Sequence, residues 1–385
     1  MRPDRTVYVL GAGFSADAGV PTVKTFLQRA REYFDAPTSP LPTYLEAHYK
    51  TVLKYRQVVK RSRDSLNLDL DDIETLFSLI DMDSLAAEQA GLGSADSIKH
   101  MIAHTVEVCR RPYHRFVVKI PDEGLKKARW PNELVERYRT PTPPVSSFTE
   151  VELDQYTLFA SVVGGLFEPK GRRVEDAIVT FNYDTVVEEA IRKLGGTVDY
   201  GLTRIRDARQ KPPAEKLFTV PIFKLHGSSN WAQASKRGVR AVLHDRYEDF
   251  GARTAPLVVP PTWKKGDLAP MFAEIWRGAR KALANATRIC IIGYSMPVTD
   301  PFFHHLMASA LSENEGLYRL DVVDLNTPHG SPGPIATRYQ EVFEPLDAYG
   351  RLTFHGEGFA RFLSSARQWI TAFGRGEAIS DVTVY

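Results

Sequence analysis

The sequence predicts an α/β fold: a Rossmann-like, mainly parallel sheet with helices on both faces and a large helical insertion. An apolar run at residues 7–10 leads directly into a glycine-containing turn and then a helical pattern, the order of a nucleotide-binding strand, loop and helix. Five later strand-like runs alternate with helix-compatible stretches, which is typical of a parallel sheet. Between these regions, residues of about 30–165 show mainly helical spacing, with a proline-rich loop at 139–147.

The 385 residues include 43% hydrophobic and 25% charged residues, the composition of a folded globular protein. This length allows one elaborated domain or two domains. We expect a single domain over residues 1–385. The insertion of about 30–165 would follow the first strand, loop and helix, and the core would resume over about 170–385.

The overall charge and the cysteine count exclude several classes of protein. A net charge of +2, from 49 basic and 47 acidic residues, does not require a nucleic-acid partner and leaves that possibility open, and no membrane partner is expected. Two cysteines, Cys109 and Cys290, can form neither a disulfide framework nor a four-cysteine zinc site, so no metal is expected. Without a signal peptide or long apolar segment, the expected location is the cytoplasm.

The stretch GAGFSADAGVP at residues 11–21 predicts a dinucleotide as the ligand. Gly11 and Gly13 lack side chains that would keep the backbone from a pyrophosphate, and the amides opening the next helix would point at the anion. Glycine loops of this kind also occur as plain turns. No strand ending in an acidic, ribose-binding residue follows within about 20 positions, which argues against a hydride-transferring enzyme.

Polar residues follow the later strand-like runs at 177–181, 219–225, 257–259, 288–292 and 319–325. Because ligands bind outside the carboxyl ends of parallel strands, these residues predict a site. Taken singly, Asn182 and Asp184 also fit a side-chain turn and helix cap before Val186, and His226 fits a buried histidine bonded to backbone. Together with the glycine loop they favour a site. The residues at these positions, polar except for the two glycines, are Asn182, Tyr183, Asp184, His226, Gly227, Ser228, Asn230, Gly293, Tyr294, Ser295, Asp300 and Asn326.

Two further patterns predict local structure. One helix is expected to begin with Asp300 as N-cap and Pro301 at its first position, and to end at Gly316. Near the end of the chain an aromatic stripe is expected to close the core rather than to dock a neighbour. Its members are Phe354, Phe359, Phe362 and Trp369.

The motifs GAGFSADAGVP, TFNYD, LHGSSNW, GYSMPVTD and VVDLN, in this order, resemble the sirtuin-like proteins of bacteria. Within that family the chain is most similar to the branch of antiphage NAD hydrolases. Deacetylase sirtuins carry a four-cysteine zinc module, which two cysteines cannot build. In the helical insertion, Asp72, Ile73 and Glu74 resemble a recurrent acidic motif whose role the resemblance does not indicate.

The resemblance implies a role for each matching residue. Asn182 and His226 match the family's catalytic pair. The nucleotide loop is matched by Gly11, Ala12, Gly13, Ser15 and Pro21. Further contacts to NAD+, chiefly to its adenosine and riboses, are implied for Asp184, Ser228, Gly293, Ser295 and Asn326.

The implied activity is hydrolysis of NAD+ to nicotinamide and ADP-ribose, which would deplete NAD+ during antiphage defence under the control of homo-oligomer assembly or a partner. Departure of the pyridinium as a neutral molecule needs no acid, and the transition state should resemble an oxocarbenium ion. We expect Asn182 to position the ribose or water and neutral His226 to accept a proton. The alternatives are NAD-dependent protein deacylation or ADP-ribosyl transfer, and a nucleotide-sensing or nuclease subunit of a complex with a HerA-type ATPase.

Overall fold

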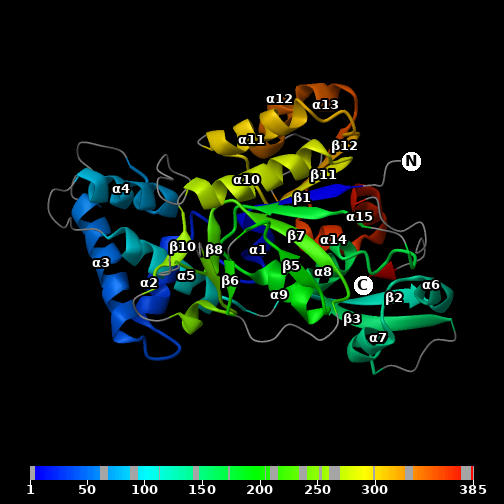
Figure 1. Cartoon of the computed structure of the whole chain (residues 1–385), viewed down its shortest axis with the longest axis horizontal. Coiled ribbons are helices and arrows are strands. Elements are labelled where there is room, and N and C mark those ends of the chain that lie inside the picture. The colour runs from blue at the N-terminus through cyan, green and yellow to red at the C-terminus, as the bar shows by residue number, and fades with distance from the viewer. Residues whose placement is uncertain are drawn as a thin grey trace.

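The computed structural model (Figure 1) describes most of the chain. The described residues are 5–60, 68–86, 94–111, 113–141, 147–171, 174–203, 205–208, 216–233, 241–250, 254–259, 269–297, 300–325, 333–373 and 383–384. The predicted binding residue Asn326 therefore lies outside the described residues.

The central sheet has seven strands in the order β13-β12-β11-β1-β4-β7-β5, and all neighbouring strands run parallel. Strand β1 pairs with β4 on one side and β11 on the other, so the strand order reverses there, which is where parallel sheets bind ligands. This confirms the predicted α/β class. The bounds are β1 (Thr6–Leu10), β4 (Ala177–Thr180), β5 (Thr197–Asp199), β7 (Thr219–Lys224), β11 (Arg288–Ile292), β12 (Arg319–Val323) and β13 (Leu352–His355).

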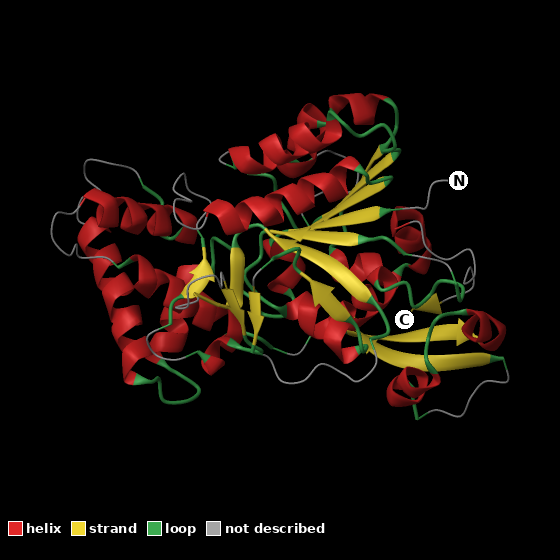
Figure 2. Cartoon of the chain, viewed as in Figure 1, coloured by secondary structure: helices red, strands yellow, loops and turns green. Residues whose placement is uncertain are grey.

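Helices cover both faces of this sheet (Figure 2). One face carries α10 (Ala269–Ala284), α11 (Pro301–Leu311), α12 (Pro334–Val342) and α13 (Glu344–Ala348). The other carries α8 (Gln155–Val163), α9 (Val186–Lys193), α14 (Phe359–Ser364) and α15 (Ala366–Phe373). Burial on both faces explains why the central strands are continuous apolar runs.

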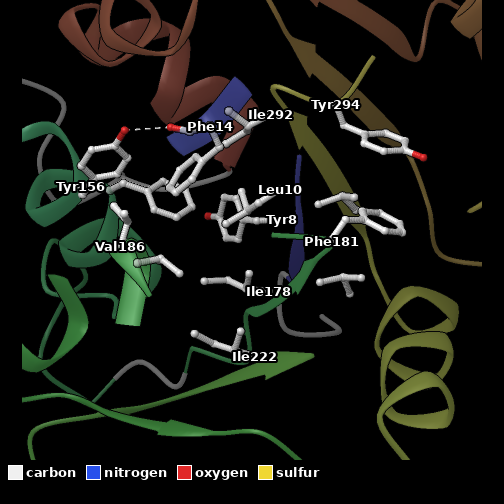
Figure 3. Packing of buried hydrophobic residues seen from close by; sticks show 14 of the residues in the cluster. Tyr8, Leu10, Phe14, Tyr156, Ile178, Phe181, Val186, Ile222, Ile292 and Tyr294 are labelled. Carbon is white, nitrogen blue, oxygen red and sulfur yellow. Dashed lines mark hydrogen bonds between the residues drawn. The ribbon is translucent and has the colours of Figure 1, made fainter. Parts of the chain in front are cut away.

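Aromatic side chains link the sheet to the helices below it. Tyr8 of β1 packs edge-on against Phe159 of α8 and Phe373 of α15, with ring centroids 5.2 and 5.0 Å away. Figure 3 shows Tyr8 and Leu10 between Phe14 and Ile178 in this core. Phe359, Phe362 and Trp369 are buried and Phe354 packs against the same cluster, which confirms that the late aromatic stripe closes the core.

The first four helices of the insertion lie together beyond the carboxyl ends of the central strands (Figure 1). They are α2 (Phe26–Asp35), α3 (Thr43–Lys60), α4 (Ile73–Ala86) and α5 (Ala95–Val108). A small antiparallel sheet follows, formed by β2 (Arg115–Pro121), β3 (Phe148–Asp154) and β14 (Thr383–Val384), with α6 (Asp122–Lys127) and α7 (Asn132–Tyr138). The prediction of a mainly helical insertion missed β2 and β3, although both alternate buried and less buried residues, the period of a strand.

A second sheet, in the order β10-β8-β9-β6, lies between the central sheet and the insertion helices. Its strands are β6 (Ile205–Asp207), β8 (Gly227–Gln233), β9 (Ala241–Leu243) and β10 (Pro256–Val258), and a 3₁₀ turn, η2 (Tyr247–Asp249), follows β9. The run at 257–259 was predicted to be a strand of the mainly parallel sheet. It instead falls in β10, which belongs to the second sheet and pairs antiparallel with β8. A three-residue apolar run carries no signal of its direction, so the sequence could not place it.

Helix α11 begins as predicted but ends early. The Asp300 carboxylate accepts a hydrogen bond from the Phe303 amide at 3.1 Å, and Pro301 is the first helical residue. The helix ends at Leu311 with Ser312 as its C-cap, so the prediction of Gly316 as its end was wrong. Asn314 forms the turn instead, because its Oδ1 accepts from the amides of Gly316 and Leu317 at 2.8 Å each.

Candidate functional site

The glycine loop leads from β1 into the short helix α1 (Ala12–Ala16). The Gly11 amide donates to the Ile292 carbonyl at 3.0 Å, and the Gly13 amide to that of Gly293 at 2.8 Å. A Cβ on Gly11 would lie 2.5 Å from the Gly293 oxygen, and one on Gly293, whose φ is +62°, would lie 2.2 Å from the Phe14 nitrogen. These glycines therefore let the ends of β1 and β11 touch.

This finding corrects the predicted reason for the glycines. Of the amides that open the helix and were expected to face a pyrophosphate, that of Gly13 donates to the Gly293 carbonyl and that of Phe14 donates to the Gly11 carbonyl at 3.0 Å. Helix α1 also has only five residues, so few peptide dipoles add up at its start. Contact between two backbones at the strand reversal, rather than approach of an anion alone, demands glycine here.

Tyr156 of α8 holds α1 in place. Its hydroxyl donates to the Phe14 carbonyl at 2.9 Å, drawn as the dashed line in Figure 3, and accepts from the Ala18 amide at 3.1 Å. Burial raises the pKa of Tyr156, so the hydroxyl keeps the proton that it donates. Sequence reasoning missed this tyrosine because nothing in the insertion's pattern separates it from ordinary core residues.

Asn182 joins the glycine loop to the end of β4. Its Nδ2 donates to the Gly11 carbonyl at 2.8 Å and lies 3.2 Å from Ser15 Oγ, and its main-chain amide donates to Thr180 Oγ1 at 3.0 Å. Asn182 is partly exposed, whereas Ser15 is buried. The structure thus brings together the predicted residues Gly11, Ser15 and Asn182.

His226 lies in the short link between β7 and β8. Only 4% of the residue is exposed. Its ring packs edge-on to Phe181, with centroids 5.3 Å apart, and lies 6.3 Å from the ring of Tyr183. Its carbonyl accepts from the Val259 amide at 2.9 Å. His226 therefore lies within an aromatic wall built by the residues that flank Asn182.

A buried ion pair sets the turn after β4. Lys224 and Glu188 are 1% and 2% exposed, and Lys224 Nζ donates to Glu188 Oε1 at 2.8 Å and to the Asp184 carbonyl. The Asp184 carboxylate accepts from the Val186 amide at 3.0 Å, which is the side-chain turn considered as its alternative role. Sequence reasoning missed Lys224, although a lysine within the apolar run PIFKLHG was an available signal.

Tyr294 and Asp300 extend the aromatic wall after β11. The Tyr294 hydroxyl donates to Asp300 Oδ2 at 2.5 Å, and its ring stacks on Phe181 at 4.8 Å and 13°. The Tyr339 hydroxyl donates to the Tyr294 carbonyl at 2.7 Å. Burial first, and then Asp300, raise the pKa of Tyr294. Figure 3 shows Phe181 and Tyr294 side by side.

The other predicted binding residues differ in accessibility. Gly13 and Ser295 are exposed, Ala12 and Gly293 are half-buried, and Pro21 is buried. Ser228 is fully buried in β8, where its hydroxyl donates to Asn230 Oδ1 at 2.8 Å. Gly293 lies beside the cluster around Asn182, because its carbonyl accepts from the Gly13 amide. The Ser228 side chain is instead hydrogen-bonded within the second sheet.

A cavity of about 460 Å³ lies behind the glycine loop, between α1, α2 and the end of α5. Its walls include Pro21, Arg29, Cys109 and Arg111, but neither Asn182 nor His226. Among the described ranges, no group of three or more His, Cys, Asp or Glu side chains is arranged to hold a metal ion. In the same part of the chain, no helix is long and apolar enough to cross a membrane.

Comparison with known proteins supplies a family for part of the chain. An α/β sheet with polar residues gathered at its strand reversal defines a nucleotide-binding class of fold. Residues 176–323, less than half of the chain, match the family model of the SIR2-like domain. This segment includes Asn182, His226 and Gly293, whereas the glycine loop precedes it. No curated protein matches the chain.

Solved sirtuin structures show only a distant likeness. Sir2 in complex with the inhibitor EX-527, 2′-O-acetyl-ADP-ribose and a deacetylated p53 peptide is 13% identical, with a TM-score of 0.36, over 97% of this chain and 94% of that chain. Sir2Tm bound to a propionylated peptide and a Sir2–p53 peptide–NAD+ complex are each 12% identical, with the same TM-score and coverage. Likenesses at this level support no conclusion about what the chain binds.

Proposed function

We propose that the chain is an NAD+ hydrolase that releases nicotinamide and ADP-ribose. The SIR2-like match over residues 176–323 supports a nucleotide site. The observation that carries the proposal is the bonding of Asn182 Nδ2 to the Gly11 carbonyl and Ser15 Oγ. It unites two motifs 171 residues apart at the sheet's reversal point.

The chemistry needs a positioned water and a proton acceptor. The water oxygen attacks C1′ of the ribose that carries nicotinamide. The C1′–N bond breaks, and its electron pair returns to the pyridinium nitrogen, so nicotinamide leaves uncharged. One water proton passes to His226 and then to solvent, and the other remains on the new hydroxyl of ADP-ribose. Asn182 orients the ribose or the water, and the aromatic wall around His226 limits access of bulk water.

The cellular role and assembly follow from the resemblance to the antiphage branch. As part of the same proposal, the enzyme acts in the cytoplasm to deplete NAD+ during antiphage defence. Because an unregulated NAD+ hydrolase would harm its own cell, we propose that homo-oligomer assembly or a HerA-type ATPase partner controls it. The reaction drawn above uses no metal.

The first test follows nicotinamide and ADP-ribose after purified protein is mixed with NAD+, alone and with any partner encoded nearby. His226→Ala and Asn182→Ala should each lower turnover at least about 100-fold, the scale of a positioned acid–base or orienting group. His114→Gln, at an exposed position, is the matched control and should keep full turnover. Near-normal turnover in His226→Ala would contradict its role, and release only with an acylated peptide present would indicate a transferase instead.

A further inference from the structure

The cavity behind the glycine loop and the cluster around Asn182 share helix α1 but no lining residue. Ser15 Oγ lies 3.2 Å from Asn182 Nδ2, whereas the next residue, Ala16, lines the cavity. Of the predicted NAD+ contacts that the structure describes, only Pro21 lines it. The cavity volume of about 460 Å³ is within the range of small-molecule sites. The cavity is therefore large enough to hold a second ligand.

The lining of this cavity carries more positive than negative charge. Arg29 of α2 and Arg111, which follows α5, supply two guanidinium groups, and Glu32 supplies one carboxylate. Arg29 pairs with Glu32 at 3.0 Å, but the two side chains are 52% and 49% exposed, so the pair is weak. Within the described ranges, no carboxylate forms an ion pair with Arg111. The cavity therefore suits an anionic ligand.

Two hydroxyl groups lie on the wall between the glycine loop and α2. They belong to Thr22 and Thr25, whose Oγ1 atoms are 3.1 Å apart. A phosphate group has three oxygens that accept hydrogen bonds, whereas a carboxylate has two. Two guanidinium groups and a hydroxyl therefore match a phosphate better than a carboxylate. The apolar residues Val20, Pro21 and Ala36 remain free to contact the body of the ligand.

The cavity is also the place where the glycine loop meets the end of α5. The Arg111 amide donates to the Ala18 carbonyl at 2.9 Å. Gly19 lies so close to α5 that a Cβ there would be 2.4 Å from the Cys109 carbonyl oxygen. A ligand held by Arg111 would therefore restrain the segment that follows α1, the helix that carries Ser15.

We propose that this cavity is a second ligand site, which binds a small molecule through a phosphate group and thereby tightens the binding of NAD+. Arg29 and Arg111 hold the phosphate between α2 and the end of α5. The bound ligand keeps α1 in the position that brings Ser15 to Asn182, so the two ligands favour each other. The site itself is independent of NAD+ hydrolysis, whereas its effect on NAD+ rests on the proposed function.

Calorimetry of the full chain without NAD+ tests the site. Inorganic phosphate and ribose 5-phosphate should bind, and ribose, which lacks the phosphate, should not. Arg111→Gln should weaken the binding of ribose 5-phosphate at least about 10-fold, the scale of a hydrogen bond to a charged group. Ala36→Trp, at an exposed position on the rim, should block the cavity and abolish binding. Lys24→Gln removes an exposed charge that lies outside the lining; it is the matched control and should bind as wild type does.

The effect on NAD+ is measured in His226→Ala, which should not consume it. Saturating ribose 5-phosphate should lower the dissociation constant of NAD+ at least about 5-fold, and NAD+ should lower that of ribose 5-phosphate by the same factor. An NAD+ affinity that ribose 5-phosphate leaves unchanged would overturn the coupling.

Three results would overturn the second site. They are the absence of phosphate binding, binding of ribose 5-phosphate that persists in both Arg111→Gln and Ala36→Trp, and competition between ribose 5-phosphate and NAD+. The third result would make the cavity part of the NAD+ site. A wild type that binds ribose 5-phosphate as expected but neither binds nor cleaves NAD+ would support the second site and overturn the proposed function.

Discussion

Lys224 shows how a single residue links the stability of this fold to its site. Its ammonium group is bonded to Glu188 and to the Asp184 carbonyl, with 1% of the lysine side chain exposed. Asn182 lies two residues before Asp184, and His226 lies two residues after Lys224. The Lys224 ammonium group therefore fixes the turn that carries Asn182 relative to the strand end that carries His226.

Replacing Lys224 separates these two effects. Lys224→Met leaves Glu188 buried without its cation, so we expect the free energy of unfolding to fall by about 3–5 kcal/mol. Lys224→Met combined with Glu188→Leu removes both charges and should recover most of that stability. Turnover should be lower than wild type in Lys224→Met and in the double variant alike, since nothing holds the Asp184 carbonyl in either. Urea unfolding and NAD+ cleavage measure the two effects, and near-normal turnover in the double variant would show that the ion pair is structural only.

At the residue scale, the sequence predicted one contact of the candidate site and missed the reason for its glycines. Asn182 and the glycine loop do meet, as their positions after parallel strands predicted. The glycines serve backbone contact with Gly293, a role that no local pattern can reveal because the partner is about 280 residues away in the chain.

Helices α3 and α5 pack through three histidines that are buried or half-buried. The rings of His48 and His100 stack at 4.3 Å and 7°. His100 Nδ1 lies 2.6 Å from the Tyr247 hydroxyl, and His104 Nδ1 lies 3.0 Å from that of Tyr49. Burial lowers the pKa of His104 to about 4, and burial together with His48 lowers that of His100 to about 4. These rings are therefore neutral at pH 7.

This element should make stability depend on pH. A histidine has a pKa of about 6.5 in the unfolded chain and about 4 in the fold, so the unfolded state binds the proton first. Each ring should therefore cost stability as pH falls from about 6.5 to 4, by up to about 1.4 kcal/mol per pH unit. Glu74 and Glu107, with pKa raised to about 7, act in the opposite direction over this range, so variants must be compared with wild type.

His104→Leu isolates the effect, because Tyr49 keeps its 2.7 Å hydrogen bond to Thr105. The difference in unfolding free energy between wild type and this variant should change by about 1 kcal/mol per pH unit between pH 6.5 and 4.5. Urea unfolding at several pH values measures it. His114→Gln, at an exposed site, should follow wild type. A difference between wild type and His104→Leu that does not vary with pH would exclude a buried neutral ring.

The success of prediction also varied among the elements. Strands β4, β7, β11 and β12 are apolar runs followed by polar turns, and their existence was predicted within two residues at each end. Strands β2 and β3 were missed because they lie in a polar, proline-interrupted stretch. Strand β8 was not predicted, because its residues GSSN were interpreted as site residues that follow the preceding strand, yet it is buried between β10 and β9.

On the scale of the whole molecule, the site is built from parts that share one core. A single hydrophobic cluster contains residues of β1, β4, β7, β11 and of the insertion helices α2 to α5. The aromatic residues that surround His226 come from the ends of these strands. Ligand binding should therefore stabilise the chain as one unit, which is also what the predicted single domain requires.

Calorimetric unfolding of His226→Ala with and without NAD+ tests this expectation. We expect one cooperative transition for residues 1–385, and NAD+ at 100 times its dissociation constant should add about 2.7 kcal/mol of stability. For a chain of this size, that corresponds to an upward shift of the transition by a few degrees. The same shift should appear whether unfolding is followed by far-UV circular dichroism or by tryptophan fluorescence, because both report the same event. Two transitions, of which NAD+ moves only one, would instead divide the chain into an independent nucleotide-binding core and a separately folding insertion.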